Sequence, residues 1–319
     1  MSKIVPYMNV RTVFMGTPQF AAIILESLLQ SPCRMVAVYT QPDRPAGRRH
    51  RVSPSPVKRL AMEQGIRIIQ PETLKSGEAV DELAGLRPEL IVVAAFAFIL
   101  PGEVLTLPGF GCLNIHPSLL PRHRGASPVA NAILCGDDTT GVTVMLMDSG
   151  MDTGPILAQE EEEVFPEDTT GSLNSRLAGV GAGLLLKTLP EWLAGRVRPQ
   201  PQDGSRATCS GLITVEDAEL DWRLPALELW RRVRAYNPWP GSYSRWRTKR
   251  LKVHEAVPLD DAATGEPGTV MTLPEPPGVG VMTGRGILGL EQVQLEGKQK
   301  MSADEFVRGK RDFIGSVLG

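Results

Sequence analysis

The stretch Leu90-Ile91-Val92-Val93-Ala94-Ala95 begins the longest apolar run of the chain, which ends at Leu100. A strand that is covered on both faces has this continuous apolar form, because none of its side chains meets water, and such strands are typical of parallel sheets. The run is far shorter than the roughly 20 residues that a membrane-spanning helix needs. We therefore predict that residues 90–95 form a buried strand of a parallel sheet.

Segments with strand and helix patterns alternate on both sides of this run. The expected strands are Thr12–Met15, Met35–Tyr39, Ile66–Gln70, Leu90–Ala95, Cys112–His116 and Val142–Met147, and the expected helices include Phe20–Leu29 and Val57–Gln64. Strand, crossover and strand again is the pattern of a parallel sheet, so we predict an α/β domain with a doubly wound, mostly parallel sheet. Ligands of such sheets bind beyond the carboxyl ends of the strands, which directs attention to residues just after Met15, Ala95, His116 and Met147.

A change of composition near residue 198 predicts a second domain. A helix at Leu173–Leu193 ends the first domain, residues 1–197, and residues 198–210 have the Pro- and Gly-containing composition of an exposed linker. Residues 211–319 contain short β-like runs separated by Pro and Gly, which is typical of a small β-barrel. These runs are Leu251–Ala256, Gly268–Met271, Val279–Met282 and Ile287–Val293, with helices expected at Pro225–Ala235 and Ser302–Arg311.

Composition and missing motifs exclude several classes of function. The 34 Lys and Arg against 36 Asp and Glu give a net charge of -2, so any nucleic-acid binding must be local. Four cysteines without C-x-x-C spacing argue against a zinc site, a redox pair and a secreted disulfide scaffold, and we predict no metal site. Gly16 is the only glycine of a dinucleotide-binding pattern after the first strand, and the chain has no P-loop motif, which disfavours NAD, FAD and ATP as cofactors.

The richest polar stretch runs from Gly111 to Ala126. Asn114 and His116 are separated by one position at the end of a predicted strand, so their side chains emerge on the same face. Gly125 in the following loop leaves room for a ligand. A second polar loop, after the next strand, holds Asp152.

An amide, an imidazole and a carboxylate together can support acyl transfer. Asn114 would stabilise an oxyanion, His116 would move a proton, and Asp152 would orient the imidazole. No Ser, Cys or Lys nucleophile is clearly partnered with them, which favours direct attack by a substrate amine over a covalent enzyme intermediate. The ordinary alternatives are a buried structural histidine and local turn chemistry for the aspartate.

A wider set of motifs occurs in order from about Arg11 to the C-terminus. The motifs are Gly16-Thr17-Pro18, Gln41 to Arg48, Ser55 to Lys58, Asn114-Ile115-His116 followed by Ser118 to Pro121, Met151 to Gly154, and Arg234 to Pro240. Together they resemble the methionyl-tRNA formyltransferase family, a branch of the folate-dependent formyltransferases. Phe96, Ala97, Pro117 and His123 differ from the residues usual in that family.

This resemblance implies a Rossmann-like formyltransferase domain followed by an OB-like β-barrel that binds tRNA. It implies transfer of a formyl group from the co-substrate 10-formyltetrahydrofolate, without a metal, to the methionine amino group of initiator methionyl-tRNA in translation initiation. By the family pattern, Asn114, His116 and Asp152 are the catalytic residues. The same pattern implies that the folate-binding turn consists of Ser118, Leu119, Leu120 and Pro121.

Two basic clusters are candidates for contact with the tRNA. The loop after the second strand carries Arg44, Arg48, Arg49 and Arg51. The resemblance favours insertion of this loop against an acceptor stem over an ordinary solvated loop. Residues 223–252 hold nine Lys or Arg and one acid, and phosphate contacts are expected from Arg231, Arg234, Lys249, Arg250 and Lys252. The tryptophans among them are expected to be core residues.

Two alternatives remain open from the sequence. A folate-dependent formyltransferase for a ribonucleotide would normally end near the linker, and one for a sugar amine would be revealed by activity that does not depend on tRNA. A non-catalytic RNA-binding protein on the same two domains would bind RNA without formyl transfer. The first residues lack the apolar stretch of a signal peptide, and we expect a cytoplasmic monomer without a membrane segment.

Overall fold

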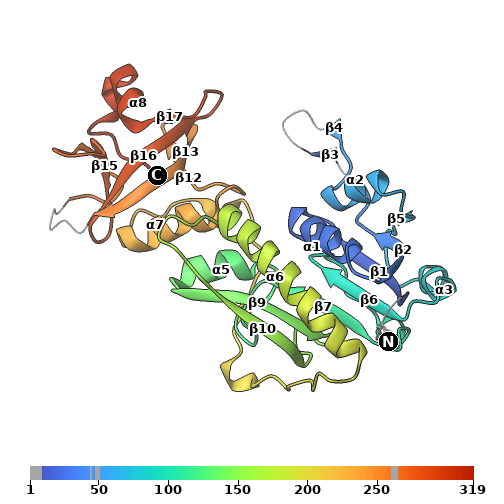
Figure 1. The fold of residues 1–319 in the computed structure, drawn as a ribbon. Helices are drawn as coiled ribbons and strands as arrows, with labels where there is room; N and C mark the ends of the chain where they lie inside the picture. Colours follow the sequence, from blue (N-terminus) through green and yellow to red (C-terminus); the bar gives the residue numbers. More distant parts are fainter. Residues whose placement is uncertain (1–8, 44, 47–50, 260–264) are drawn as a thin grey trace. The chain divides into compact units, whose positions relative to one another are not determined.

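The computed structural model describes residues 9–43, 45–46, 51–259 and 265–319 (Figure 1). The chain divides into two compact units. Unit 1 contains the described residues of Met1–Pro128, Thr139–Glu163 and Asn174–Gly211, and unit 2 contains those of Val129–Asp138, Val164–Leu173 and Leu212–Gly319. The division of the chain into domains at residues 198–210 stays a prediction.

Unit 1 is built on a seven-stranded sheet with the order β10-β9-β7-β6-β1-β2-β5. Its strands are β1 (Arg11–Gly16), β2 (Arg34–Tyr39), β5 (Ile68–Ile69), β6 (Leu90–Ala94), β7 (Cys112–His116), β9 (Thr139–Leu146) and β10 (Ile156–Glu163). Strands β5, β2, β1, β6 and β7 pair in parallel, which confirms the predicted mostly parallel sheet. Each parallel pairing needs a crossover connection. The crossovers contain α1 (Gln19–Leu29), α2 (Pro56–Glu63), α3 (Gly77–Gly85) and α4 (Gly102–Leu105).

Strands β9 and β10 depart from the parallel pattern. β9 pairs antiparallel with β7, and β10 pairs antiparallel with β9. The carboxyl end of β9 therefore lies beside the amino end of β7, where the backbone N–H of Met147 donates to the carbonyl oxygen of Cys112 (2.8 Å). The expectation that the residues after Met147 leave the sheet at the same edge as those after His116 is wrong, because it assumed a parallel strand.

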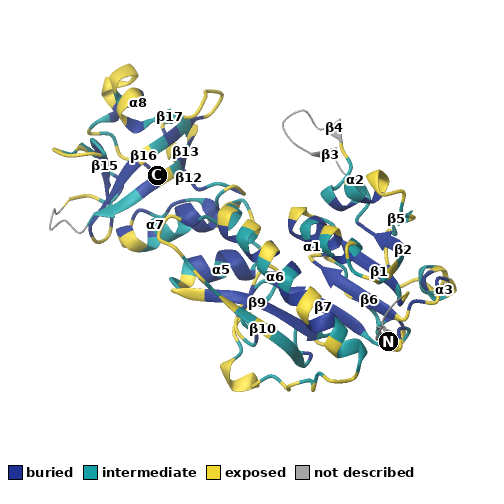
Figure 2. Cartoon of the chain, in the orientation of Figure 1, coloured by how far each residue is buried: buried dark blue, intermediate teal, exposed yellow. Residues whose placement is uncertain are grey.

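The central strands are buried on both faces, as the apolar run predicts. All residues of β6 and β7 are buried (Figure 2), and Ile91 packs in one core cluster with Val13 of β1. Full burial of such a side chain contributes about 1.5–3 kcal/mol. Gly16 ends β1 in a close contact: an added Cβ would lie 2.6 Å from the Cβ of Ala21 and 2.7 Å from the carbonyl oxygen of Ala94. This glycine therefore permits close packing between strands and helix α1.

Further elements lie outside the seven-stranded sheet and the larger sheet of unit 2. The helices are α5 (Pro128–Cys135) and α6 (Thr170–Leu193), and the short strands are β3 (Pro45–Ala46), β4 (Arg51–Val52), β8 (Arg124–Gly125) and β11 (Cys209–Ser210). Three 3-10 turns lie at Gly204–Arg206, Glu216–Ala218 and Arg311–Phe313. Helix α6 matches the helix predicted at Leu173–Leu193.

Unit 2 contains a curled antiparallel half-barrel, in agreement with the predicted β-rich C-terminal domain. Its strands are β12 (Tyr243–Trp246), β13 (Lys249–Leu259), β14 (Val270–Thr272), β15 (Val279–Met282), β16 (Ile287–Leu295) and β17 (Met301–Ser302). The order is β12-β13-β16-β15-β14, and β17 pairs with β16. The helices are α7 (Ala226–Ala235) and α8 (Ala303–Gly309), close to the predicted positions.

Tryptophans form part of the core of unit 2, as expected, with one exception. Trp222 and Trp246 are buried, and Trp230 is partly buried against the same cluster. Trp246 packs edge to face on Phe313, with ring centroids 5.3 Å apart. Trp239, in contrast, is 60% exposed. The expectation of a structural role therefore fails for Trp239.

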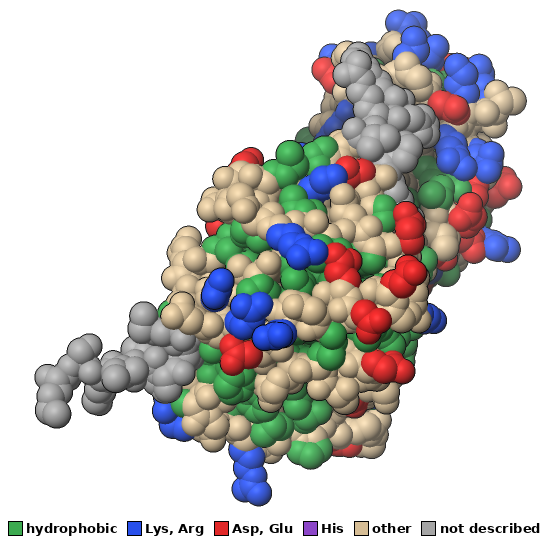
Figure 3. All heavy atoms as spheres, turned by 90° about the vertical axis from the view of Figure 1, so that its right-hand side faces the viewer, with side chains coloured by type: hydrophobic (Ala, Val, Ile, Leu, Met, Phe, Trp, Pro, Cys, Tyr) green, Lys and Arg blue, Asp and Glu red, His purple; other side chains and the backbone are tan. Residues whose placement is uncertain are grey.

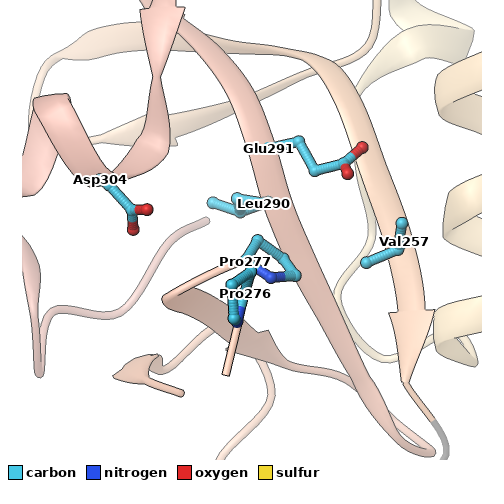
Figure 4. Close-up of a pocket in the computed structure, with 6 residues that line it drawn as sticks. All are labelled: Val257, Pro276, Pro277, Leu290, Glu291 and Asp304. Carbon is cyan, nitrogen blue, oxygen red and sulfur yellow. The ribbon is translucent and has the colours of Figure 1, made fainter. Parts of the chain in front are cut away.

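The surface agrees with the nearly balanced charge of the sequence. On the face of the molecule drawn in Figure 3, Lys and Arg side chains are interspersed with Asp and Glu. Unit 2 has a pocket of about 320 Å³ that contains none of the predicted site residues (Figure 4). Its lining residues are Val257, Pro276, Pro277, Leu290, Glu291 and Asp304. No helix within the described part of the chain is long and apolar enough to cross a membrane.

Candidate active site

Strand β7 carries two of the predicted catalytic residues. Asn114 and His116 are 9% and 4% exposed, and they lie between the parallel neighbour β6 and the antiparallel neighbour β9. Val93 of β6 is the register partner of Asn114, and Thr143 of β9 is that of His116. Because side chains alternate along a strand, the amide and the imidazole point to the same face of the sheet.

The loop between β9 and β10 brings in the third residue, Asp152. Although this loop begins beside the amino end of β7, Asp152 Oδ1 accepts a hydrogen bond from Nδ2 of Asn114 (3.3 Å). Its Oδ2 lies 3.7 Å from Nδ1 of His116 and accepts from the backbone N–H of Gly125 (2.8 Å). The three side chains predicted from the sequence are thus neighbours in the structure. The bond to Asp152 uses one of the two Nδ2 hydrogens of Asn114 and leaves the other for a further acceptor.

Hydrogen bonding defines which nitrogen of His116 exchanges a proton. Nε2 lies 3.0 Å from the carbonyl oxygen of His123. A carbonyl oxygen only accepts, so Nε2 carries the hydrogen, and Nδ1 is the nitrogen that gains or loses one. His123 itself has a φ of 56°, an uncommon conformation for a residue with a side chain. The imidazole therefore presents its basic nitrogen to the carboxylate of Asp152.

Burial sets the charge of His116 in the resting site. Removal of the imidazole from water lowers the pKa of His116 below its ordinary value of 6.5. The negative charge of Asp152 and the hydrogen bond to His123 raise that pKa but do not outweigh burial, and the charge of the His123 side chain lowers it. The side chain is consequently neutral near pH 7 and able to accept a proton.

Gly125 has a different role from the one expected. The sequence suggested that this glycine leaves room for a ligand. An added Cβ there would lie 2.3 Å from the carbonyl oxygen of Ser210, and the φ of Gly125 is 105°, which favours glycine. The glycine permits close contact between β8 and β11, and it exposes the N–H that binds Asp152.

The predicted folate turn follows β7 and is held rigidly from β9 and β10. Thr143 Oγ1 donates to the carbonyl oxygen of Ser118 (2.7 Å) and accepts from the backbone N–H of Leu120 (3.1 Å). Gln159 Nε2 donates to the carbonyl oxygen of Leu120 (2.9 Å) and to Thr143 Oγ1 (2.8 Å). The hydroxyl of Ser118 donates to the carbonyl oxygen of Arg122 (2.7 Å), so this side chain shapes the turn from inside.

Strands β9 and β10 and the segment after α6 contain functional candidates that the sequence did not reveal. Thr143 and Gln159 fix the turn, and Thr208 accepts through its hydroxyl from the backbone N–H of His123 (2.8 Å). A threonine inside the apolar run 142–147 was a weak signal, because a buried hydroxyl needs partners. Nothing local marked Gln159 or Thr208. Among the described residues, no group of three or more His, Cys, Asp or Glu could hold a metal ion.

Most of the predicted tRNA-binding loop of unit 1 is not among the described residues. Arg44, Arg48 and Arg49 lie outside the described residues, and for Arg51 only the backbone, in β4, is described.

A polar cluster holds the residue that precedes this loop. Lys58 Nζ donates to Asp43 Oδ2 (2.5 Å) and to Gln70 Oε1 (2.7 Å), and Gln70 Nε2 donates to Asp43 Oδ1 (3.0 Å). The hydrogen bond from Lys58 lowers the pKa of the Asp43 carboxyl below its ordinary value. The side chain of Asp43 is therefore fixed by two partners.

The basic residues of unit 2 fall into two groups. Lys249 and Arg250 are exposed on β13, and the guanidinium of Arg250 lies over the ring of Tyr243, 4.5 Å from its centroid. Lys252 donates to the carbonyl oxygen of Pro240 (3.1 Å), and Arg231 is half-buried.

Arg234, in contrast, is only 9% exposed. Its Nη1 donates to the carbonyl oxygens of Phe165, Pro166 and Asp168 at 2.9–3.4 Å. Its guanidinium stacks 3.7 Å from the ring centroid of Trp230, and burial lowers its pKa to about 10. The structure gives Arg234 the role of an internal cross-link.

Known proteins are similar to this sequence along nearly its whole length. Residues 8–189 match the family described as formyl transferase, and residues 212–311 match the formyl transferase C-terminal domain. The methionyl-tRNA formyltransferase of Roseiflexus castenholzii is 47% identical over 314 residues, which covers 98% of this chain and 100% of the relative. That of Dehalococcoides mccartyi is 45% identical over 311 residues, which covers 98% of this chain and 99% of the relative.

A solved structure shares the fold. The N-formyltransferase of Helicobacter canadensis, in complex with folinic acid and dTDP-3-aminofucose, has a TM-score of 0.64 at 17% identity and covers 88% of this chain and 99% of that chain. This likeness concerns the fold alone, so it does not favour the sugar-amine alternative. The relatives with 45–47% identity carry the name of the tRNA enzyme. By both matched domains and by these relatives, the chain belongs to the methionyl-tRNA formyltransferase family.

Proposed function

We propose that Asn114, His116 and Asp152 are the catalytic residues of this enzyme, which transfers a formyl group from 10-formyltetrahydrofolate to the methionine amino group of initiator methionyl-tRNA. One observation carries the proposal. Asp152, from a loop that leaves β9 at the far end of β7, lies 3.3 Å from the amide of Asn114 and 3.7 Å from the imidazole of His116. Close contact of an oxyanion donor, a base and a carboxylate that orients the base is an arrangement suited to acyl transfer to an amine.

The residues divide the chemistry between them. When the amine attacks the formyl carbon, a C–N bond forms and the electron pair of the carbonyl moves to its oxygen, where the second N–H of Asn114 stabilises the charge. Nδ1 of His116 takes the proton of the attacking nitrogen, and the carboxylate of Asp152 stabilises the imidazolium that results. When the bond to the folate nitrogen breaks, that nitrogen keeps the electron pair and receives the proton from His116.

The turn at residues 118–121 is proposed to hold the folate. Its backbone is fixed by Thr143 and Gln159, and Leu120 is buried while Leu119 is half-buried. A turn that keeps one shape loses little conformational entropy when the co-substrate binds. The position of this turn directly after His116 puts a folate bound there next to the imidazole.

Phosphate contacts to the tRNA are proposed from both basic clusters. In unit 2 we assign them to Arg231, Lys249, Arg250 and Lys252, and in unit 1 to the residues Arg44, Arg48, Arg49 and Arg51. Arg234 is left out because its guanidinium is buried and already bonded to three carbonyl oxygens. We also propose that the enzyme acts as a monomer in the cytoplasm, where charged initiator tRNA is available. Light scattering at assay concentration tests the monomer.

Transfer of labelled formyl to methionyl-tRNA tests the catalytic assignment. We expect His116→Ala to lower kcat by about 10²–10⁴-fold and Asn114→Ala by about 10²–10³-fold. The matched control is His254→Ala, because His254 lies in unit 2 and bonds to Gln294. Full activity of the His116 variant, or equal loss in the control, would contradict the proposal.

A further inference from the structure

We propose that Gln202 is a positioning residue for the transfer reaction: its side-chain amide holds the Asp152 loop so that the carboxylate faces Asn114 and His116. The inference rests on the proposed function, because it assigns Gln202 an effect on rate that acts through Asp152. Gln202 belongs to residues 198–210, which the sequence predicted as a linker, and it lies fifty positions from Asp152 in the chain.

Every polar group of the Gln202 side chain is occupied. Nε2 donates to the carbonyl oxygens of Asp152 (2.8 Å) and Gly154 (2.7 Å), which uses both of its hydrogens. Oε1 accepts from Nε (3.1 Å) and Nη2 (2.8 Å) of Arg124. With carbonyl oxygens on one side and a guanidinium on the other, the amide has one favourable orientation. Gln202 therefore joins the loop of Asp152 to β8.

The same short strand also holds the carboxylate of Asp152. Arg124 precedes Gly125, and the N–H of Gly125 donates to Asp152 Oδ2 (2.8 Å). The backbone of Asp152 is held by Gln202, which binds Arg124 of β8, and its side chain is held by Gly125 of β8. Both the backbone and the carboxylate of Asp152 are therefore positioned relative to β8. Strand β8 is fixed in turn by parallel pairing with β11.

The backbone of Asp152 needs such support. Its φ of 54° lies in the left-handed region, which residues with a Cβ adopt at a cost of roughly 1–3 kcal/mol and keep only when their surroundings enforce it. Loss of the two Gln202 bonds would allow this backbone to relax and move the carboxylate away from Asn114 and His116. A misplacement of about 1 Å at a catalytic group can lower a rate by about 10²-fold.

Kinetics of Gln202→Ala and Gln202→Glu test the proposal, with Gln200→Ala as the matched control. Gln200 lies on the same segment, but among the described residues its side chain bonds only to the carbonyl oxygen of Arg198. We expect both Gln202 variants to lose about 10²-fold in kcat with unchanged KM for folate and tRNA. The glutamate keeps the volume and the contact with Arg124 but has no hydrogens to donate. Full activity of Gln202→Glu would show a space-filling role and overturn the proposal.

Two further readouts distinguish positioning from a merely structural role. In an Asp152→Ala background, Gln202→Glu should cause no further loss of kcat, because its effect acts through Asp152. The acid limb of the pH profile should move to lower pH in Gln202→Ala, which adds no charge, since the pKa of His116 is raised by the charge of Asp152 and lowered by burial and by the charge of His123. Losses that multiply, or an unmoved acid limb, would overturn the proposal.

The activity of the wild-type enzyme distinguishes a failure of the proposed function from a failure of the positioning role of Gln202. A wild type that transfers no formyl group to methionyl-tRNA would refute the proposed function and this inference with it. An active wild type, combined with a Gln202→Glu variant as active as Gln200→Ala, would refute the positioning role alone. If Gln202→Ala does not fold, Gln202→Glu still decides, because it keeps the contact with Arg124.

Discussion

Two threonines on strand β9 give opposite predictions for the same substitution to valine. Thr143 is fully buried, and its hydroxyl bonds to the backbone of Ser118 and Leu120 and to the side chain of Gln159. Thr140 is 2% exposed, and its hydroxyl has no hydrogen-bond partner among the described residues. Valine has nearly the same shape and a similar preference for strands, so only the hydroxyl changes.

The expected changes in the free energy of unfolding follow from these hydrogen bonds. Thr143→Val leaves the N–H of Leu120 and the carbonyl of Ser118 buried without this partner, and each such group costs about 1–3 kcal/mol. Gln159 keeps its bond to Leu120, so it adds little. We expect a loss of about 2–6 kcal/mol in the free energy of unfolding. Thr140→Val removes an unpaired buried hydroxyl and adds a methyl group, so we expect no loss and a gain of up to about 1 kcal/mol.

Urea unfolding followed by circular dichroism measures both variants. Hydrogen exchange of peptides that contain residues 117–124 reports whether Thr143→Val loosens the turn, and the KM for 10-formyltetrahydrofolate should rise in this variant alone. Equal destabilisation by the two substitutions would refute the reasoning, since the two sites differ chiefly in hydrogen bonding. A loss below about 0.5 kcal/mol for Thr143→Val would also refute it, because this is the ordinary effect of a surface substitution.

Three further predictions concern the site and the basic cluster. Asp152→Asn removes the charge that raises the pKa of His116, so the acid limb of kcat/KM against pH should move to lower pH while kcat falls. An upward shift would contradict the contact between Asp152 and His116. Gly125→Ala should lower both stability and kcat, because the added Cβ lies 2.3 Å from the carbonyl oxygen of Ser210 and a φ of 105° is strained for alanine. A melting temperature and kinetic constants at wild-type values would refute this prediction. Arg234→Met should destabilise unit 2, since three carbonyl oxygens lose their donor. Arg250→Ala should leave stability unchanged and reduce the salt dependence of tRNA binding, because Arg250 is exposed. The reverse pattern in thermal unfolding and filter binding would contradict the two roles.

The parts of the fold that local pattern determines were predictable. The apolar run at residues 90–95 specified a parallel strand because it has no polar position on either face, and the strand in the structure covers Leu90–Ala94, with Ala95 exposed after its end. The spacing of Asn114 and His116 put both on one face, since alternation along a strand depends only on the sequence. The antiparallel course of β9 was not predictable in this way. Strand pairing is a long-range contact, and the sequence of a buried strand is similar in both directions.

The charge pattern predicted the presence of a basic cluster but not the state of each member. Arg234 and Arg250 are alike in sequence terms, yet one is buried against Trp230 and the other is exposed. The difference depends on the carbonyl oxygens of residues 165–168, which are more than sixty positions away in the chain. The burial of each tryptophan was equally unpredictable from the sequence, because Trp239 is exposed while Trp246 is in the core.

The position of Asp152 shows why a motif can indicate a candidate catalytic residue without explaining its placement. If β9 ran parallel to β7, the loop after β9 would emerge next to His116 and would need no special conformation. Because β9 is antiparallel, the loop starts at the other end of β7, and Asp152 meets Asn114 and His116 with its backbone in the left-handed region. Such a backbone persists only where other contacts enforce it. Those contacts come from Gly125 and from Gln202 in the segment after α6, so residues far from Asp152 in the chain hold its backbone and its carboxylate.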